Sequence, residues 1–180
     1  MEPKQLSVLT SVLLSNAFHL LALIPLYHLT RRLFPLNRSL ATVTCILHAF
    51  TPANAFLISG NTESLFTFLS FFGMALFHND HRLLPAIIWS LAGTVRSNAL
   101  LWTGFFVWDA LNTILTFNGR SIPKTIGRLG YLGVCAVISL GGFAFWQYSA
   151  WEQYCSSSTP QQWCSNTLPL IYLHVQSKYW

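Results

Sequence analysis

Charged side chains are scarce in this sequence. Lys, Arg, Asp and Glu together make up 8% of its 180 residues, whereas about 25% is usual in soluble globular domains. Hydrophobic residues make up 53% and aromatic residues 15%, and the mean hydropathy is +0.47. Ten basic and five acidic residues are too few to cover the surface of a soluble domain of this size. The composition therefore excludes an ordinary soluble protein and indicates a membrane protein.

The formal net charge of +5 does not indicate a nucleic-acid partner. Nucleic-acid-binding proteins gather their basic residues on one patch or segment. Here the basic residues lie at the ends of apolar runs, where the cytoplasmic anchors of membrane helices belong. The sequence also lacks polar linkers, low-complexity segments and internal repeats. We therefore expect a single membrane domain over residues 1–180 and no nucleic-acid partner.

The sequence lacks a metal-ligand pattern as well. Its six His residues show no ligand spacing, and Cys155 and Cys164 fit no zinc signature. We predict no metal site and identify no cofactor, although a metal requirement stays open. These two cysteines lie in a polar segment with eight residues between them. A disulfide between them is expected in an oxidising lumen, and two free thiols are the alternative.

Apolar runs separated by charges predict an all-α, polytopic membrane protein with about six transmembrane helices. About 20 residues cross the hydrocarbon core of a bilayer, and 26 uncharged residues lie between Lys4 and Arg31. Residues 149–180 follow the last run and are expected to form a lumenal loop. The predicted spans are 6–29, 39–59, 64–78, 83–95, 99–117 and 129–148.

Two basic segments set the predicted orientation. Residues 31–38 and 120–128 carry three cations each and no acid. Four predicted spans separate them, so both fall on one side of the membrane, which the positive-inside rule makes cytoplasmic. The N-terminus, Glu63, Arg96 and the segment 149–180 then lie on the lumenal side.

Glu63 lies alone between uncharged runs of 24 and 16 residues. Ionisable groups within apolar runs are costly and are usually functional. The predicted spans 64–78 and 83–95 are short, and at 1.5 Å per residue they cover only about 20–24 Å of a ~30 Å core. We therefore expect Glu63 and Arg96 to lie close together in a polar recess below the lumenal surface. The alternative is that each helix extends past its charge, with the head group snorkelling.

Three segments carry a resemblance to a known family. They read NAFLISGNTESLFTFLSFFGM at 54–74, TVRSNALL at 94–101 and WCSNTLPLIYLHVQSKYW at 163–180. In this order they resemble the PIG-V family of glycosylphosphatidylinositol (GPI) mannosyltransferases, and the variations favour a fungal member. Residues near the N-terminus are similar to the family helix that precedes a basic loop. The combination is specific, whereas each segment alone would be a weak signal.

The resemblance implies part of a GT-C type glycosyltransferase membrane domain in the endoplasmic reticulum (ER) membrane. The implied activity is that of an α-1,6-mannosyltransferase of GPI-anchor biosynthesis, which adds the second mannose in the ER lumen. The implied partners are the lipid donor dolichol-phosphate mannose, the GPI precursor as acceptor, and a possible accessory membrane subunit. The alternative is a non-catalytic polytopic protein, a transporter or scaffold, favoured if Glu63 and Arg96 form a closed ion pair without an acceptor cavity.

The chain also departs from the family pattern. The family has a lumenal Trp-Asp motif followed by an aromatic pair, which is expected to hold the catalytic acid. The only Trp-Asp pair here, Trp108-Asp109, lies inside a predicted span, and Asn61 and Ala99 replace a family Tyr and Gly. We therefore expect an internal fragment or a truncated gene model that is inactive by itself. Its catalytic residue is unknown, and Glu63 is the candidate.

The expected substrate-binding residues lie in the three segments that carry the resemblance: Glu63, Arg96, Asn98, Gln176, Lys178 and Tyr179. Arg96 suits a phosphate, because the guanidinium group offers a planar fork of donors to oxyanions, and a salt bridge to Glu63 is the alternative. Glu63 suits a sugar hydroxyl or a metal, and the alternative is a carboxylate that stabilises the start of a helix.

Three further polar residues have simpler interpretations. Ser97 and Asn98 are expected to cap the following span, an interpretation preferred to substrate contact. Asp109 is expected to pack against Asn112 and Thr113, its polar neighbours along the helix.

The orientation can be tested with an introduced N-glycosylation site. A site placed within residues 119–124 should carry no glycan in microsomes, because this segment is predicted to be cytoplasmic and glycosylation occurs in the lumen. Gel mobility before and after glycosidase treatment measures the outcome. A glycan at this position would show that the orientation is wrong.

Overall fold

The computed structural model describes residues 3–51, 57, 59–117, 122–156, 161–165 and 170–179. Every regular element in these ranges is a helix, which confirms the predicted all-α class. The α-helices are α1 (Pro3–Leu33), α2 (Arg38–Ala49), α4 (Glu63–Phe77), α5 (Leu83–Val95), α6 (Thr103–Leu115), α7 (Ile122–Cys155) and α8 (Ile171–Tyr179). Two 3₁₀ helices complete the set: η1 (Ser97–Trp102) and η2 (Gln162–Ser165).

Two helices of the described chain are long and apolar enough to cross a membrane, Lys4–Leu33 and Ile122–Cys155. They belong to α1 and α7, the longest helices of the structure. The apolar helices α4 and α5 are shorter, with 15 and 13 residues. The bounds of α5 are those of the predicted run 83–95, because the charged residues Arg82 and Arg96 directly flank it.

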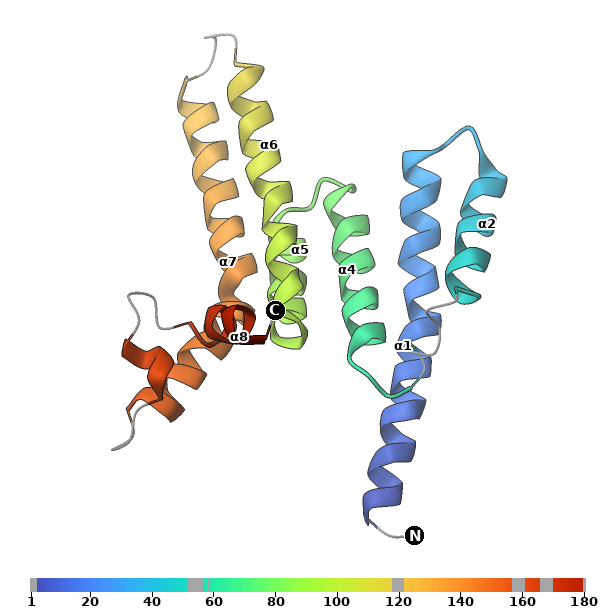
Figure 1. Cartoon of the computed structure of the whole chain (residues 1–180). Helices are drawn as coiled ribbons and strands as arrows, with labels where there is room; N and C mark the ends of the chain where they lie inside the picture. The colour runs from blue at the N-terminus through green and yellow to red at the C-terminus, as the bar shows by residue number, and fades with distance from the viewer. Residues whose placement is uncertain are drawn as a thin grey trace.

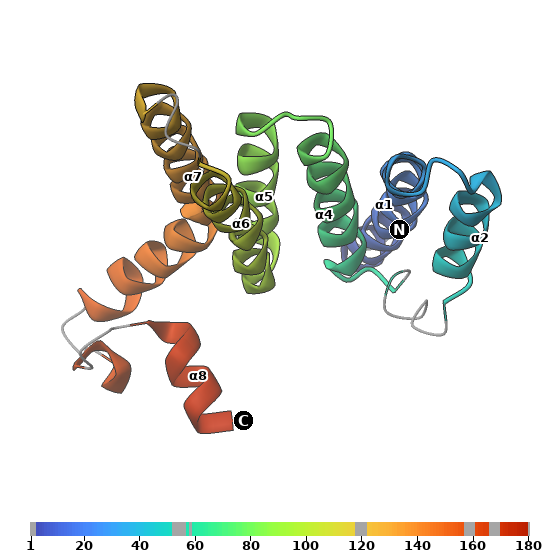
Figure 2. The ribbon, with the colours of Figure 1, turned by 90° about the horizontal axis from the view of Figure 1, so that it is seen from above.

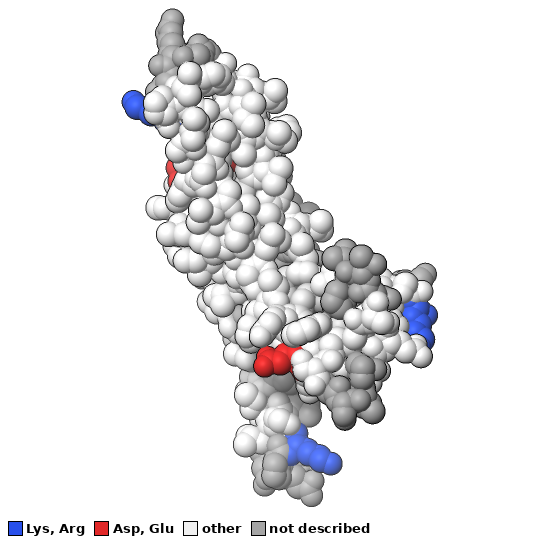
Figure 3. Space-filling model, turned by 90° about the vertical axis from the view of Figure 1, so that its left-hand side faces the viewer, with Lys and Arg blue, Asp and Glu red and all other residues white. Residues whose placement is uncertain are grey.

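The long helices lie in one row, as Figure 1 and Figure 2 show from two directions. In this row α1 packs between α2 and α4, and α5 packs between α4 and α7. The helix α6 packs against α7 and is joined to α5 through η1. Since α4 and α5 run antiparallel, the first residue of α4 lies beside the last turn of α5. The space-filling view in Figure 3 shows one long face on which most of the surface carries no charge.

The helices of the row have two ends, which differ in the residues that they carry. One end holds the α1–α2 loop, the α4–α5 loop and the start of α7 (Figure 1), and we call it the basic end. The opposite end holds the N-terminus, the start of α4, the end of α5 and the end of α7, and we call it the Glu63 end. The described parts of the two basic segments, 31–38 and 122–128, therefore lie at the same end. Among the described residues, the cations of the basic end are Arg31, Arg32, Arg38, Arg82, Lys124 and Arg128.

An aromatic cluster forms the core between α4, α5, α6 and α7. Phe77, Trp89 and Phe106 are each at most 9% exposed. Their ring centroids lie 5.5–5.7 Å apart in all three pairings, in tilted and edge-to-face arrangements. Such pairs add roughly 0.5–1.5 kcal/mol each beyond the burial of apolar area. Leu132 and Cys135 bring α7 into the same cluster.

Small residues allow the helices of this core to approach closely. A Cβ atom on Gly142 of α7 would overlap the backbone carbonyl of Ser90 in α5, and one on Gly93 would lie 3.1 Å from the backbone nitrogen of Phe143. The Gly142 N–H also donates a hydrogen bond to Ser90 Oγ at 2.9 Å. Close contact of this kind is typical of helix packing in membranes, where small residues and polar bonds hold helices together. The α5–α7 contact therefore depends on these residues.

Three segments differ from their predicted form. Within the run 39–59 the helix α2 ends at Ala49, and Thr51 precedes a proline, which disfavours helical backbone there; residues 52–56 and 58 lie outside the described residues. The run 99–117 begins as the 3₁₀ helix η1 and becomes α6 at Thr103. The segment 149–180, expected as a loop, contains the end of α7, η2 and α8. Its nine α8 residues include no Gly or Pro to interrupt a helix.

The α5–α7 contact gives a prediction with an internal control. Gly142→Ala should lower the free energy of unfolding by about 1–3 kcal/mol, because the added methyl group forces the two helices apart. Gly130→Ala in the same helix should be neutral or stabilising, because nothing lies within 4 Å of the added Cβ. Unfolding of both purified variants in detergent measures the difference. Equal stability of the two variants would contradict the packing described here.

Candidate functional site

The start of α4 is held against α1 by buried hydroxyl groups. Ser64 is fully buried and donates a hydrogen bond to the carbonyl oxygen of Leu57. Ser15 of α1 donates to the same carbonyl at 2.6 Å. Gly60 has a left-handed backbone, with φ of 82°, and an added Cβ would lie 2.9 Å from a serine hydroxyl of α1. This turn therefore places Glu63, the first residue of α4, in a defined position.

Arg96 reaches Glu63 because the chain leaves the helical conformation at the end of α5. Arg96 has extended backbone angles, with φ −150° and ψ 137°, and its Nη1 forms an ion pair with Glu63 Oε1. Both side chains are 34% exposed, and the Arg96 Cζ lies 5.9 Å from the ring centroid of Phe66. Glu63 and Arg96 are therefore close together, as expected from the sequence. Their contact is the salt bridge that was the alternative to phosphate binding by Arg96.

A cavity of about 230 Å³ lies beside Arg96, between the end of α5 and α7. The Trp146 indole N–H donates a hydrogen bond to the carbonyl of Thr94 at 2.8 Å, which links the two walls. The side-chain oxygen of Gln147 is buried and has no hydrogen-bond partner among the described residues. The residues that line the cavity are Gly93, Thr94, Val95, Arg96, Ser97, Phe143, Trp146 and Gln147.

The other expected substrate-binding residues are not joined to the ion pair. Asn98 is exposed in η1, and Gln176 and Lys178 are exposed on α8, which packs against α7. Among the described residues no hydrogen bond or ion pair connects these three to Glu63 or Arg96. Tyr179 is the last residue of α8. Its side chain lies outside the described part of the chain. The roles of all six residues remain predictions.

The expected capping by Ser97 and Asn98 is wrong. The N-cap of α6 is Trp102 and the N-cap of η1 is Arg96, and neither end has a side-chain cap hydrogen bond. The reason is that η1 continues directly into α6, so no free helix start follows Ser97 and Asn98.

The interpretation of Asp109 is also corrected. Its carboxylate accepts a hydrogen bond from Arg82 Nε at 2.7 Å and one from Arg128 Nη2 at 2.8 Å. Thr113 instead bonds the backbone carbonyl of residue 109. Asp109 and Arg82 are only 14% and 16% exposed, and the Arg82 Cζ lies 4.1 Å from the ring centroid of Phe77. These three charged residues form a second ionic cluster, at the basic end.

The sequence carried a signal for this second cluster. A carboxylate inside an apolar helix needs a partner, because an unpaired charge there is costly. Two basic residues, Arg82 and Arg128, lie next to apolar runs at the basic end of the helices. Only the packing of α5, α6 and α7 shows that they meet Asp109. A cavity of about 270 Å³ adjoins the cluster, but its two Arg and two Asp residues balance each other in charge.

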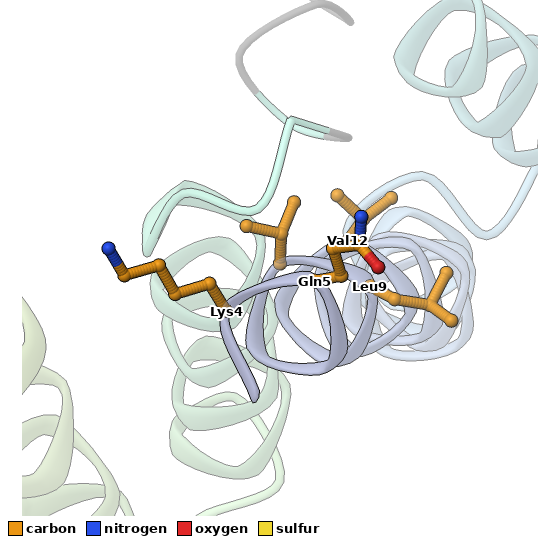
Figure 4. Close-up of a pocket in the computed structure, with 5 residues that line it drawn as sticks. Lys4, Gln5, Leu9 and Val12 are labelled. Carbon is orange, nitrogen blue, oxygen red and sulfur yellow. The ribbon is translucent and has the colours of Figure 1, made fainter. Parts of the chain in front are cut away.

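A further cavity lies on α1 and does not form a site. Its volume is about 430 Å³, and Figure 4 shows side chains that all come from one helix, α1. It is lined by Lys4, Gln5, Val8, Leu9 and Val12. A hollow on the outer face of a single helix brings no groups from different elements together, whereas ligand sites do.

The remaining candidate ligands are two cysteines and two histidines. Cys155 at the end of α7 is bonded to Cys164 in η2, with their Cα atoms 5.5 Å apart. His19 and His48 lie with ring centroids 5.2 Å apart, between α1 and α2, a proximity that sequence spacing did not reveal. Over the described ranges, no three His, Cys, Asp or Glu side chains are placed to hold a metal ion.

Comparison with known proteins shows one family along the chain. The family model described as mannosyltransferase (PIG-V) matches residues 4–180. GPI mannosyltransferase 2 of Schizosaccharomyces pombe is 35% identical over 175 residues, which cover 96% of this chain and 37% of that protein. The protein of the same name from Yarrowia lipolytica is 35% identical over 173 residues, 95% of this chain and 45% of its own length.

A mammalian relative gives the same result. GPI alpha-1,6-mannosyltransferase 2 of Mus musculus is 31% identical over 201 residues, 96% of this chain and 40% of that protein. The chain thus spans less than half the length of these relatives. No solved structure matches the chain.

The cluster around Asp109 gives a stability prediction. Asp109→Asn should lower the free energy of unfolding by about 1.5–3 kcal/mol, because Arg82 loses its charged acceptor in a largely buried place. Asp80→Asn is the matched control, since Asp80 is 88% exposed and lies 3.8 Å from Arg82. Asn also tolerates the positive φ of 64° at this position.

Heat or denaturant unfolding in detergent measures both variants. The control should stay within about 0.5 kcal/mol of the unmodified protein, as is usual for an exposed pair. A loss at position 80 as large as the loss at position 109 would show that the cluster does not stabilise the fold in the way described.

Proposed function

The chain belongs to the mannosyltransferase (PIG-V) family, and from this premise we propose that it contributes to the second mannosyl transfer of GPI-anchor assembly. The resemblance seen in three sequence segments is thereby confirmed. In this proposal the complete protein transfers α-1,6-linked mannose from dolichol-phosphate mannose to the GPI precursor, in the ER lumen. The observation that carries the proposal is the family match over residues 4–180.

The proposed topology has about six spans, with the Glu63 end in the lumen. The two basic segments at the opposite end support this orientation by the positive-inside rule. The Cys155–Cys164 bond at the Glu63 end supports it independently, because disulfides persist in oxidising compartments. The helices α1 and α7 are each long enough to span the bilayer. The shorter α4 and α5 leave Glu63 and Arg96 within the protein, below the membrane surface.

Mannosyl transfer from a lipid phosphate makes two demands on the protein. The acceptor hydroxyl must lose a proton as its oxygen attacks the anomeric carbon. The departing phosphate must be held by positive groups that stabilise its developing charge. Arg96 meets the second demand, because one guanidinium nitrogen pairs with Glu63 and other donors of the group remain for a phosphate oxygen.

Glu63 has two roles in this proposal. Its carboxylate fixes the direction of the Arg96 guanidinium, and it is the candidate to orient the acceptor hydroxyl. The buried hydroxyl bonds of Ser15 and Ser64 hold the start of α4, so the carboxylate is supported from α1. Support of this kind is what a precise site requires from the residues behind it. The catalytic acid or base is not assigned to any other residue of this chain.

One observation favours a second function. Glu63 and Arg96 compensate each other in charge, as expected for a structural ion pair in a non-catalytic transporter or scaffold. The cavity beside Arg96 favours the transferase, because a closed structural ion pair needs no space for a ligand beside it. The two functions therefore make different predictions for substitutions at this pair.

We expect Glu63→Gln, made in the complete protein, to reduce mannosyl transfer strongly while protein abundance stays close to that of the unmodified protein. Arg96→Lys keeps the charge but loses the planar fork of donors, so use of the lipid donor should weaken. Transfer to the one-mannose GPI precursor in microsomes measures activity, and immunoblotting measures abundance. The parent protein must first restore GPI proteins in cells that lack the second GPI mannosyltransferase.

The exchanged variant, with Glu63→Arg and Arg96→Glu combined, separates the two functions. A structural ion pair predicts that each single change lowers abundance and that the exchange restores it. A transferase site predicts normal abundance for the single changes and no activity for the exchange. Normal activity in both single variants would remove these residues from the site.

A further inference from the structure

Two packed helices form the walls of the cavity beside Arg96. The end of α5 forms one wall and α7 forms the other. Next to the cavity the two helices pack closely. Ser90 Oγ accepts a hydrogen bond from the Gly142 N–H at 2.9 Å, and Gly93 lies against the backbone of Phe143. Sites built on packed helices hold their groups more precisely than sites on loops. The space is therefore a fixed feature of the α5–α7 contact.

One residue that lines this cavity has a polar atom without a partner. The side-chain oxygen of Gln147 is buried, and no described residue donates a hydrogen bond to it. A buried acceptor without a donor costs roughly 1–3 kcal/mol, and such atoms in native proteins call for an explanation. A ligand hydroxyl group in the cavity would supply the missing donor once the Gln147 amide turns toward it. Among the described residues that line the cavity, Gln147 is the one with an unpaired side-chain acceptor.

An aromatic side chain stands beside Gln147 in a fixed orientation. The Trp146 indole N–H bonds the carbonyl of Thr94 at 2.8 Å, which fixes one edge of the ring system. The residue is nevertheless 53% exposed. A tryptophan held by its polar edge while its body stays open provides an apolar surface for a ligand. The C–H face of a sugar ring fits such a surface, because its hydrogens meet the negative face of the aromatic ring.

The cation completes a recognisable combination of groups. Arg96 lines the same cavity and, beside its bond to Glu63, keeps donors for an anion. An amide acceptor, an aromatic face and a guanidinium together match a hexose that carries a phosphate. The volume of about 230 Å³ lies below the roughly 300–1,000 Å³ of pockets for drug-sized ligands. It suits one sugar ring and its phosphate rather than a whole lipid-linked substrate.

We propose that this cavity is the subsite for the mannosyl phosphate of the lipid donor. Trp146 packs against the sugar ring, Gln147 accepts a hydrogen bond from a sugar hydroxyl, and Arg96 binds the phosphate. This inference rests on the proposed function, from which the donor chemistry comes. The donor is preferred to the acceptor because its phosphate is bonded directly to the transferred sugar, so that one small cavity with a cation at its edge fits both groups.

The test measures binding to the complete protein, purified in detergent, with mannose 1-phosphate, inorganic phosphate and methyl α-mannoside as probes. Gln147→Met keeps the size of the side chain and removes the acceptor. It should weaken mannose 1-phosphate binding about fivefold to tenfold, as expected for one lost hydrogen bond, and leave inorganic phosphate binding unchanged. Arg96→Met should weaken the binding of both phosphates.

Gln153→Met is the matched control, because Gln153 is exposed and lies in the same helix. Binding in this control should equal that of the unmodified protein. Thermal unfolding of every variant shows whether the fold is retained. A second variant, Trp146→Leu, should also weaken mannose 1-phosphate binding and spare inorganic phosphate, so the test does not depend on one substitution.

The outcomes separate this inference from the function on which it rests. Unchanged mannose 1-phosphate binding in folded Gln147→Met and Trp146→Leu variants would overturn the subsite, whatever the activity. Binding that depends on Gln147 in a protein that transfers no mannose would overturn the function and keep the cavity as a sugar-phosphate site. Methyl α-mannoside that binds as tightly as mannose 1-phosphate, with the same dependence on Gln147, would assign the cavity to the acceptor and overturn the donor assignment.

Discussion

The close approach of α5 and α7 is the contact on which the rest of the structure depends. It exists because Gly142 and Gly93 carry no side chain where the two backbones meet, and because Ser90 bonds the Gly142 N–H. Apolar side chains give little drive for association inside a membrane, so close backbone packing and polar bonds carry more of the stability. The aromatic core, the turn into η1 and the cavity beside Arg96 all lie on helices joined through this contact.

The partly buried charges are ion-paired at both ends of the helices. At the Glu63 end one carboxylate meets one guanidinium, and both remain 34% exposed. At the basic end Asp109 is 14% exposed and meets two arginines. The more buried carboxylate thus has the larger number of charged hydrogen bonds, as expected from the higher cost of removing it from water. The pair with fewer charged hydrogen bonds, Glu63 and Arg96, is the one that the proposed function assigns to the substrate.

The arrangement in one row leaves much of the apolar surface of the helices exposed. The helices form one row, and many large apolar side chains on them are exposed, among them Leu20, Leu101, Leu115 and Val137. Lipid can cover such surfaces in a membrane, and so can further helices. The relatives are more than twice as long as the matched region, so in them other segments of the same chain are available to pack beside this row.

Most helices followed from the sequence, because the distance between charges and apolar runs is a local property. The run 83–95 gave the bounds of α5, and Glu63 proved to be the first residue of α4. The sharing of one end by the two basic segments also followed, since alternating helices return the chain to the same side. Family membership came from three short segments, and no tertiary information was needed for it.

The contacts between distant segments were decided only by the tertiary structure. Asp109 was assigned to its neighbours along the helix, whereas its partners Arg82 and Arg128 lie 27 and 19 residues away. The segment 97–102 forms a 3₁₀ helix that follows the extended Arg96 and continues directly into α6, so the expected caps fail. The sequence did not indicate a role for Trp146 or Gln147, because one indole and one amide in an apolar helix are common, and only the packing of α5 against α7 places them beside a cavity. Helix formation is governed by nearby residues, whereas a site is made by side chains that only packing brings together.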